Sequence, residues 1–280
     1  MPKPFRFCVL LIAAFGAAGF GGLESLFAPK AELWDRWSAH DNASTATIDH
    51  GGWQRFLDTY VRAGDDGVNR VAYGRVSPAD HTALDRYIGS LTNTRVTRLS
   101  RAEQLPYWIN LYNALTVKVI LTHYPVKSIR DIDISPGLFG DGPWRKKLVE
   151  IEGEPVSLDD IEHRIIRPIW RDPRIHYAVN CAAVGCPNLQ TEAFTPANTE
   201  ELFEKAAREF VNHPRGISAD SDRVVVSSIY AWFTDDFGGD LAGVVAHLKR
   251  YADPAQAIVL EEAAEFEDAY DWSLNDDAIR

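Results

Sequence analysis

The sequence predicts an α+β protein, and three observations favour this class. Several segments repeat apolar side chains at the spacing of an amphipathic helix. Short apolar runs elsewhere in the chain are typical of β-strands. Hydrophobic residues make up 46 % and charged residues 25 % of the 280 residues, which are ordinary values for a globular chain of one large domain or two small ones.

The net charge and the cysteine count narrow the range of functions. The chain holds 40 acidic and 29 basic side chains, so its formal net charge is −11. This balance argues against nucleic acid and against anionic membrane surfaces as partners, because both attract clustered Lys and Arg. The three cysteines are too few for a disulfide-rich scaffold or for four cysteines around a metal ion.

Residues 1–22 have the layout of a secretory signal peptide. Lys3 and Arg6 form a basic head, and an apolar run with small residues at its end follows them. The run is shorter than the roughly 20 residues that a membrane-spanning helix needs. We therefore expect an exported, periplasmic protein with no integral span after signal removal. The alternative is an uncleaved N-terminal anchor.

The elements that follow are expected to be mainly helical. Residues 51–62 carry apolar side chains at helical spacing. Residues 69–77 have the pattern of a strand, and Pro78 then occupies the first position of a second helix. We expect three regions after the signal peptide: an N-terminal helical subdomain at 23–98, a core domain at 99–275 and an acidic tail end at 276–280.

A long helix is expected within residues 100–121, and it begins either after Ser100, which has capping-box spacing to Glu103, or at Leu105 with Pro106 in its first turn. It is apolar on nearly all sides, which is typical of a buried helix. Glu103, Asn110 and Asn113 nonetheless share one of its faces, and buried polar groups need partners. Either the two amides hold the backbone of a neighbouring loop, or this face takes part in catalysis or ligand binding.

A second buried helix is expected at residues 157–170, where Ser157 and Asp160 have N-cap spacing. Glu162 projects into its apolar stripe, and His163 lies at the edge of that stripe. A carboxylate on an apolar face must be paired, or its pKa must rise. Glu162 is therefore either a structural ion-pair partner of a nearby arginine or a tuned acid/base.

The third unusual segment contains both cysteines of the mature chain. Residues 175–180 are expected to form a buried strand with His176 and Asn180 on one face. His176 and Cys181 would then lie about 16 Å apart on opposite faces, so a direct dyad would need a sharp turn at Cys181.

Cys181 and Cys186 allow three interpretations. They form a disulfide across a tight loop, which is natural in an exported protein. Alternatively, one thiol is a nucleophile that a histidine activates. The third possibility is a metal site with both thiols, His and Glu, although four intervening residues are not usual zinc spacing.

Towards the C-terminus, residues 224–227 are expected to form a strand, and short helices are expected after it and at 240–252. Residues 261–280 carry eight acidic side chains and one basic side chain. We expect a solvated acidic extension here. The alternative is that its aromatic side chains, Phe266, Tyr270 and Trp272, dock it onto the body.

Five strings of this sequence resemble the domain of unknown function 547 family. In family order they are EQLPYWINLYNALT, SLDDIEHRIIR, RIHYAVNCAAVGCPNL, SSIYAWFTDDFG and YDWSLND, and they cover about residues 95–275. The resemblance implies a papain-like or transglutaminase-like architecture: a buried helix and surrounding helices packed on a twisted, mainly antiparallel sheet. A thiol, an imidazole and an amide or carboxylate meet between them. The chain departs from papain-like enzymes because its buried helix opens with Glu103 and Gln104 instead of a cysteine.

These observations lead us to expect a thiol-dependent hydrolase or acyl transferase that acts on peptide or amide bonds. The candidate catalytic residues are Cys181, Cys186, His176, His163, Glu103, Asn110 and Glu162. The candidate binding residues are Asn113, Asn180, Tyr230 and Trp232. Backbone amides at 182–185 are candidate oxyanion donors.

Two other functions remain open at this point. One is a non-catalytic periplasmic binding or scaffold module with a Cys181–Cys186 disulfide. The other is a metal-dependent hydrolase that uses His163, His176 and Glu162. The leading hypothesis needs no cofactor and no metal, and its substrate would be a small peptide or a component of the cell envelope.

Overall fold

The structure is a computed structural model. It describes residues 20–22, 25, 28–136, 142–220 and 223–278. Residues 1–19, which make up most of the predicted signal peptide and include Cys8, lie outside these ranges. Among the described residues, no helix combines the length and the apolar character that crossing a bilayer requires.

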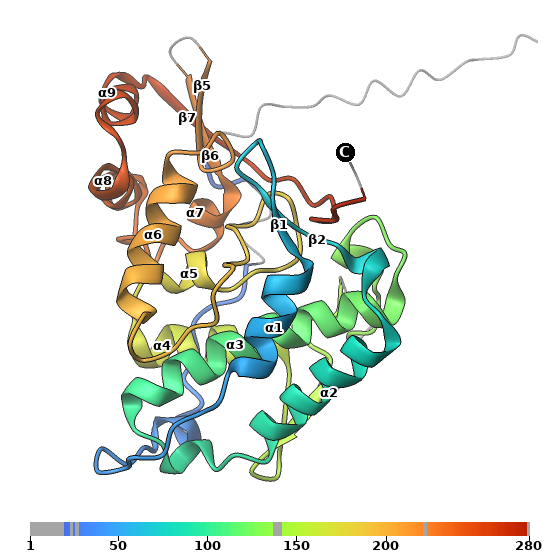
Figure 1. Ribbon diagram of the computed structural model, residues 1–280. Helices are drawn as coiled ribbons and strands as arrows, with labels where there is room; N and C mark the ends of the chain where they lie inside the picture. The colour runs from blue at the N-terminus through green and yellow to red at the C-terminus, as the bar shows by residue number, and fades with distance from the viewer. Residues whose placement is uncertain (1–19, 23–24, 26–27, 137–141, 221–222, 279–280) are drawn as a thin grey trace, which may run out of the picture.

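Helices dominate the described part of the chain (Figure 1). The α-helices are α1 (Gly51–Tyr60), α2 (Pro78–Thr92), α3 (Arg101–His123), α4 (Arg167–Trp170), α5 (Ile175–Ala178), α6 (Thr199–Val211), α7 (Ser228–Trp232), α8 (Leu241–Tyr251) and α9 (Pro254–Glu262). A π-helical segment, η6 (Asp160–Ile166), leads directly into α4. Short 3-10 turns are η2 (Asp35–Ser38), η3 (Tyr73–Arg75), η4 (Val96–Arg98) and η5 (Ile129–Asp131).

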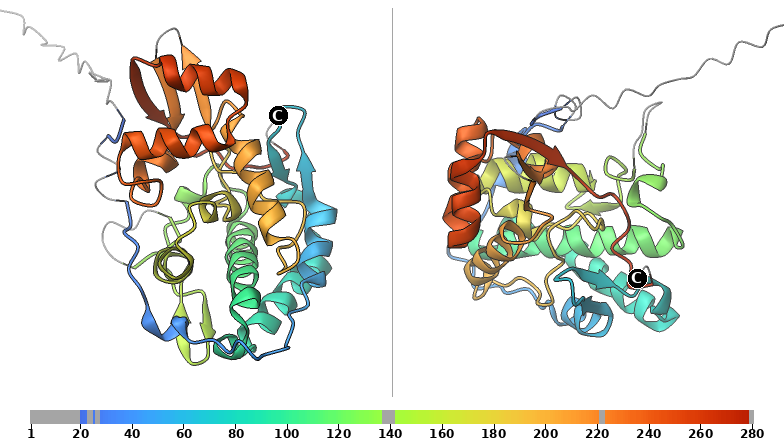
Figure 2. Two further views of the ribbon diagram at one scale, coloured as in Figure 1. Left: turned by 90° about the vertical axis from the view of Figure 1, so that its left-hand side faces the viewer. Right: turned by 90° about the horizontal axis from the view of Figure 1, so that it is seen from above.

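The described strands form three small sheets. Two are antiparallel hairpins, β1 (Val61–Ala63) with β2 (Asn69–Val71) and β3 (Val149–Ile151) with β4 (Glu154–Val156). In the third sheet, β6 (Arg223–Ser227) pairs antiparallel with β5 (Ile217–Asp220) and parallel with β7 (Glu265–Ala269). This sheet and the helices α8 and α9 gather at one end of the molecule, away from α2 (Figure 2).

Helix α3 is the centre of the larger hydrophobic core, as its all-round apolar surface predicts. The Ser100 hydroxyl accepts a hydrogen bond from the Glu103 N–H and caps the helix. The helix therefore begins at Arg101, and Pro106 lies inside it. Tyr107 and Trp108 are fully buried. A second hydrophobic core lies among α6, α8 and the three-stranded sheet.

The mixed helix and strand content confirms the α+β class. The described sheets have only two or three strands, so they are smaller than the sheet that the resemblance implies. Helix α3 packs mainly against α2 and η6 and not against a large sheet. The fold therefore supports a helix-rich α+β domain at this level of detail.

The expectation of a strand at residues 175–180 is wrong. This segment begins with the single helical turn α5. Asp172 and Pro173 start the turn through two hydrogen bonds. The Asp172 carboxylate accepts from the Arg174 N–H, and the Pro173 carbonyl accepts from the His176 N–H. The strand expected at 69–77 is also shorter, since it ends at Val71.

The acidic C-terminal segment is docked and not a solvated extension. Its β7 part joins the sheet beside β6. Residues 271–275 then run antiparallel to the cysteine loop, where the amides of Val184 and Gly185 donate to the carbonyls of Ser273 and Asp271. This segment also reaches β2, because the Val71 N–H donates to the Asn275 carbonyl. This arrangement agrees with the alternative that aromatic side chains dock the segment, because Tyr270 and Trp272 pack against Trp232.

Candidate functional site

The π-helical segment η6 places a carboxylate and an imidazole in the core. Ser157 and Asp160 cap its start reciprocally, since Ser157 donates to the Asp160 carboxylate and accepts from the Asp160 N–H. The wider π turn turns both Glu162 and His163 inwards, and both are buried. Such π turns occur frequently at functional sites.

Glu162 lies between two histidines. Its Oε1 atom is 3.7 Å from His176 Nδ1 and 4.0 Å from His163 Nδ1. Burial alone would raise the pKa of Glu162, but His163, His176 and Arg167 together lower it to about 2. Glu162 is therefore an ionised carboxylate in the core, held by cationic and hydrogen-bonding neighbours.

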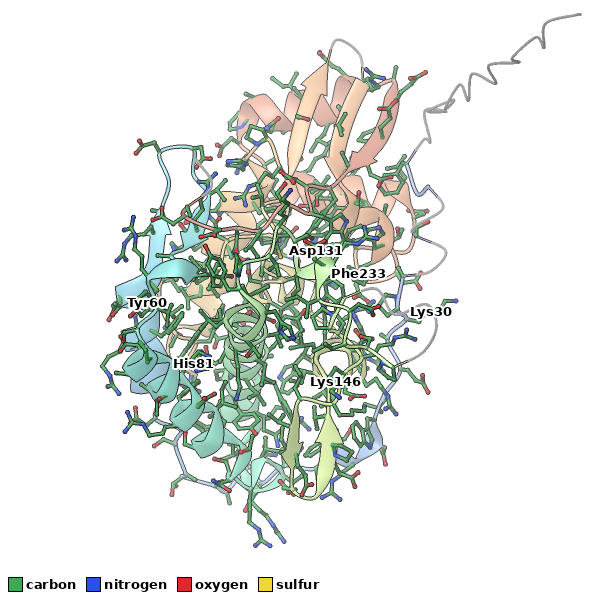
Figure 3. All side chains as sticks on the ribbon, turned by 90° about the vertical axis from the view of Figure 1, so that its right-hand side faces the viewer. Lys30, Tyr60, His81, Asp131, Lys146 and Phe233 are labelled. Carbon is green, nitrogen blue, oxygen red and sulfur yellow. The ribbon has the colours of Figure 1, made fainter. Side chains whose placement is uncertain are left out.

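His176 links this carboxylate to a second one. Its Nε2–H donates to Asp236 at 2.7 Å, and the Arg167 guanidinium donates to the same carboxylate oxygen at 2.6 Å. Burial opposes ionisation of Asp236, but these two partners hold its pKa well below the ordinary value. Phe233, labelled in Figure 3, stacks on the His176 ring with centroids 4.3 Å apart.

His163 faces the same arginine from the other side. Its Nδ1 accepts a hydrogen bond from Arg167 Nη1 at 2.8 Å. Burial lowers the pKa of His163 to about 4, with Arg167 acting in the same direction against the charge of Glu162. His163 is therefore neutral near pH 7.

The cysteine loop is folded by contacts that fix its backbone. Asn180 accepts from the Ala182 N–H and donates to the Pro187 carbonyl, and Ala182 is left-handed with φ of 61°. A Cβ on Gly185 would lie 2.7 Å from the backbone nitrogen of Asp271, so only glycine fits against the C-terminal segment at this position.

Both cysteines of this loop are free thiols that lie beside each other. The Cys181 N–H donates to Cys186 Sγ at 3.1 Å, and Tyr270 Oη lies 3.0 Å from Cys181 Sγ. Hydrogen bonds from Cys186 and Tyr270 lower the pKa of Cys181 despite burial. Burial and the neighbouring Cys181 raise the pKa of Cys186 well above the ordinary value.

The thiols and the buried carboxylate are electrostatic neighbours. The charge of Glu162 acts to raise the pKa of Cys181. Tyr112 of α3 is affected by both the carboxylate and the thiols. Its pKa is raised by burial, then by the charge of Glu162 and then by the two cysteines. One nitrogen of each imidazole is hydrogen-bonded elsewhere: His176 Nε2 to Asp236 and His163 Nδ1 to Arg167. The structure thus joins thiols and imidazoles through Glu162, not through a direct sulfur–nitrogen contact.

The two amides of α3 hold neighbouring loops by their backbone. Asn110 makes a two-way pair with Phe194, donating to its carbonyl and accepting from its N–H. Asn113 donates to the Ala178 carbonyl and accepts from the Asn180 N–H. Asn113 and Asn180 therefore shape the approach to Cys181, whereas Asn110 supports a different loop.

Glu103 also lies apart from the thiol loop. It accepts a hydrogen bond from the Ile48 N–H at 3.3 Å, and burial raises its pKa. Tyr230 is fully buried in the second hydrophobic core, where its hydroxyl accepts a hydrogen bond from Tyr177.

Trp232 packs against aromatic side chains of the C-terminal segment, one of which, Tyr270, contacts Cys181. Its ring centroid is 4.8 Å from that of Tyr270 and 5.5 Å from that of Trp272. A pocket of about 280 Å³ adjoins the same tyrosine, and its lining includes Gly185, Arg215, Ser218, Ala269 and Tyr270.

The candidate oxyanion amides are already bonded. The N–H groups of Ala182, Val184 and Gly185 donate to Asn180, Ser273 and Asp271. The Ala183 N–H is directed to Cys181 and lowers its pKa. The 182–185 turn therefore stabilises the Cys181 thiolate and leaves no amide of these four for an oxyanion.

Sequence reasoning missed three partners in this site: Tyr112, Asp236 and Tyr270. Tyr112 lies on the long helix whose polar face was predicted from Glu103, Asn110 and Asn113 alone, although a tyrosine on a buried helix needs a polar partner. Asp236 stands in the string TDDFG, shortly after the candidate binding residues Tyr230 and Trp232. Within the described residues, no cluster of three or more His, Cys, Asp or Glu side chains is arranged to hold a metal ion.

The fold and the site define an α+β domain in which two free thiols adjoin a buried cluster of carboxylates, histidines and an arginine. Residues 96–211 match the model of the family described as protein of unknown function, DUF547. The match includes both cysteines, both buried histidines and Glu162. No curated protein and no solved structure shows a significant match to the chain.

Proposed function

We propose that this protein is an exported thiol-dependent hydrolase or acyl transferase that acts on peptide or amide bonds. The observation that carries the proposal is the state of Cys181. It is the more accessible of the two thiols, it lies 3.0 Å from Tyr270 Oη, and its pKa is lowered by hydrogen bonds. A lowered pKa raises the thiolate fraction of a cysteine, and the thiolate is the nucleophilic form.

In the proposed reaction, the Cys181 thiolate attacks the carbonyl carbon of an amide. The C–N bond breaks, the amine leaves with a proton, and a thioester remains on Cys181. Water or an acceptor amine then attacks the thioester and restores the thiol. The Tyr270 hydroxyl lies 3.0 Å from the sulfur and can donate a proton, and Glu162 with His176 and Asp236 forms the charged surroundings.

The papain-like arrangement belongs to the same proposal. It is supported by the position of α3, whose Asn113 binds the backbone that leads into Cys181 and whose Tyr112 adjoins Glu162. Export is proposed from the basic head and the apolar run of the N-terminal sequence. Small peptides and peptide components of the cell envelope are the proposed substrates.

The test is turnover of a panel of amides by the full chain, including γ-glutamyl amides and peptidoglycan stem peptides. For any amide that is turned over, Cys181→Ser should abolish turnover and the thioester, which mass spectrometry detects in the unmodified enzyme. Cys186→Ser removes the buried thiol and its hydrogen bond to Cys181, so it should slow turnover but still form the thioester. Equal turnover by Cys181→Ser and unmodified protein would overturn the proposal.

A further inference from the structure

We propose that Cys181 and Cys186 form a redox-active pair that reduces disulfides, with Cys181 as the attacking thiol and Cys186 as the resolving thiol. This activity goes beyond the amide chemistry proposed above. It needs neither an imidazole nor an oxyanion site. Its substrate class is an accessible disulfide, either of a small molecule or of another protein.

The first argument is proximity. The backbone nitrogen of Cys181 lies 3.1 Å from Cys186 Sγ, and the two side chains share a hydrogen bond that lowers the pKa of Cys181. Four residues separate the cysteines, and the turn at Ala182 folds the chain back between them. The two sulfurs are thus neighbours while both are reduced.

The second argument is the rigidity of the loop that presents them. The Arg215 guanidinium donates to the carbonyls of Val184 and Cys186, and the Asn180 amide donates to the carbonyl of Pro187. These contacts hold both ends of the loop through its backbone and leave the sulfurs uninvolved. A loop that is fixed in this way keeps the pair together in both redox states.

The third argument is the difference between the two thiols. Cys181 is half-buried, whereas only 4 % of Cys186 is exposed. A bulky disulfide therefore reaches Cys181 first, and Cys186 is reached only from inside the loop. Tyr270 contacts the sulfur of Cys181, which stabilises the thiolate that attacks.

The proposed steps balance in atoms and electrons. The Cys181 thiolate attacks one sulfur of the substrate disulfide, whose S–S bond breaks, and the first thiolate leaves and takes up a proton. Cys186 then loses its proton to water and attacks Cys181 Sγ, so the mixed disulfide breaks and the second thiolate leaves. The protein pair loses two electrons, and the substrate gains them as two thiols.

The experiment uses the full chain with Cys8→Ser, so that only the two described thiols react. Excess 5,5′-dithiobis(2-nitrobenzoate) is the substrate disulfide, and the release of thionitrobenzoate is followed together with the protein mass. We expect two equivalents per chain and a protein lighter by two hydrogens. Cys186→Ser should lose the second equivalent and retain a stable mixed disulfide. Cys181→Ser should react at least about tenfold more slowly, because Cys186 is shielded.

Other outcomes would overturn the inference. One is two equivalents with two mixed disulfides on the same chain, which would mean that the thiols react independently. Another is unchanged fast release from Cys181→Ser. The result is distinguishable from the amide proposal, since Cys186→Ser is expected to lose the internal disulfide while it still forms the thioester with an amide substrate. Loss of both activities would occur only with Cys181→Ser.

Discussion

At the scale of single residues, Cys181 is subject to opposing influences. Cys186 and Tyr270 lower its pKa through hydrogen bonds, while burial and the charge of Glu162 raise it. The net effect lowers the pKa of Cys181 below that of an ordinary thiol. The effects of Cys186, Tyr270 and Glu162 each come from one side chain, so each is open to a separate substitution with a definite sign.

Replacement of Tyr270 by Phe should raise the pKa of Cys181. Phenylalanine retains the ring that packs against Trp232 and Trp272 but removes the hydroxyl 3.0 Å from the sulfur. The measurement is the pH dependence of Cys181 alkylation by iodoacetamide, located by peptide mapping, whose midpoint should move to higher pH. Tyr60→Phe, which removes a hydroxyl bonded to Asp80, is the control and should leave the midpoint in place.

Replacement of Glu162 by Gln should shift the same midpoint in the opposite direction. A neutral amide no longer repels the thiolate, so the pKa of Cys181 should fall. Glu150→Gln on strand β3 changes an exposed charge and serves as the control. A midpoint that moves upward in Glu162→Gln would contradict the electrostatic link between the carboxylate and the thiol.

Several residues of the site were predictable from the sequence, and their partners were not. Glu162, His163 and His176 were marked by their polarity within apolar segments. Asp236 and Tyr270 contact His176 and Cys181 over sequence separations of 60 and 89 residues, and no local pattern encodes such pairs.

At the scale of elements, helix α3 organises two loops by equivalent means. Asn110 binds the backbone at Phe194, and Asn113 binds the backbone at Ala178 and Asn180. The two amides are one turn apart on the same helix and both are buried. Substituting each amide in turn therefore distinguishes a general loss of loop support from a specific effect on the Cys181 thiol.

We expect Asn110→Ala and Asn113→Ala to destabilise the protein similarly, by about 2–4 kcal/mol, because each leaves two buried backbone groups unpaired. Urea unfolding measures this loss. Only Asn113→Ala should change the alkylation rate of Cys181, since Asn113 holds the segment leading into it. A change of equal size in Asn110→Ala would contradict this division of roles.

Helices with recognisable caps were predictable from the sequence, as at Ser77 and Ser100, whose hydroxyls accept hydrogen bonds from the N–H groups of Asp80 and Glu103 in the first turns of α2 and α3. The short apolar run at 175–180 was ambiguous, because four to six apolar residues fit a strand or a buried helical turn. The preceding Asp172 and Pro173 decided the outcome in favour of a turn.

At the scale of the whole molecule, the buried His50 and His163 and the half-buried His247 make the fold sensitive to acid. Burial lowers the pKa values of His50, His163 and His247 from 6.5 to about 4. Below pH 6.5 the unfolded chain binds protons at these positions and the folded chain does not, so stability falls until about pH 4. Each histidine contributes at most about 3 kcal/mol to this loss. Asp159 opposes it in part, since burial raises its pKa to about 6.

The expected outcome is a melting temperature that decreases from pH 7.5 to pH 4.5, measured by differential scanning calorimetry. His247→Gln should flatten this decrease, because glutamine takes up no proton in the unfolded chain. The exposed His40, replaced by Gln, is the control and should leave the slope unchanged. An equal slope in His247→Gln and the unmodified protein would show that His247 does not contribute.

The docked C-terminal segment has a consequence for biosynthesis. Residues 271–275 provide the backbone partners of Val184 and Gly185 and also bind Lys127 and Val71. During translation the cysteine loop therefore emerges long before the residues that complete it. The folded form of this loop can therefore be completed only after those residues have left the ribosome, and a shorter nascent polypeptide carries the two thiols on an unfinished loop.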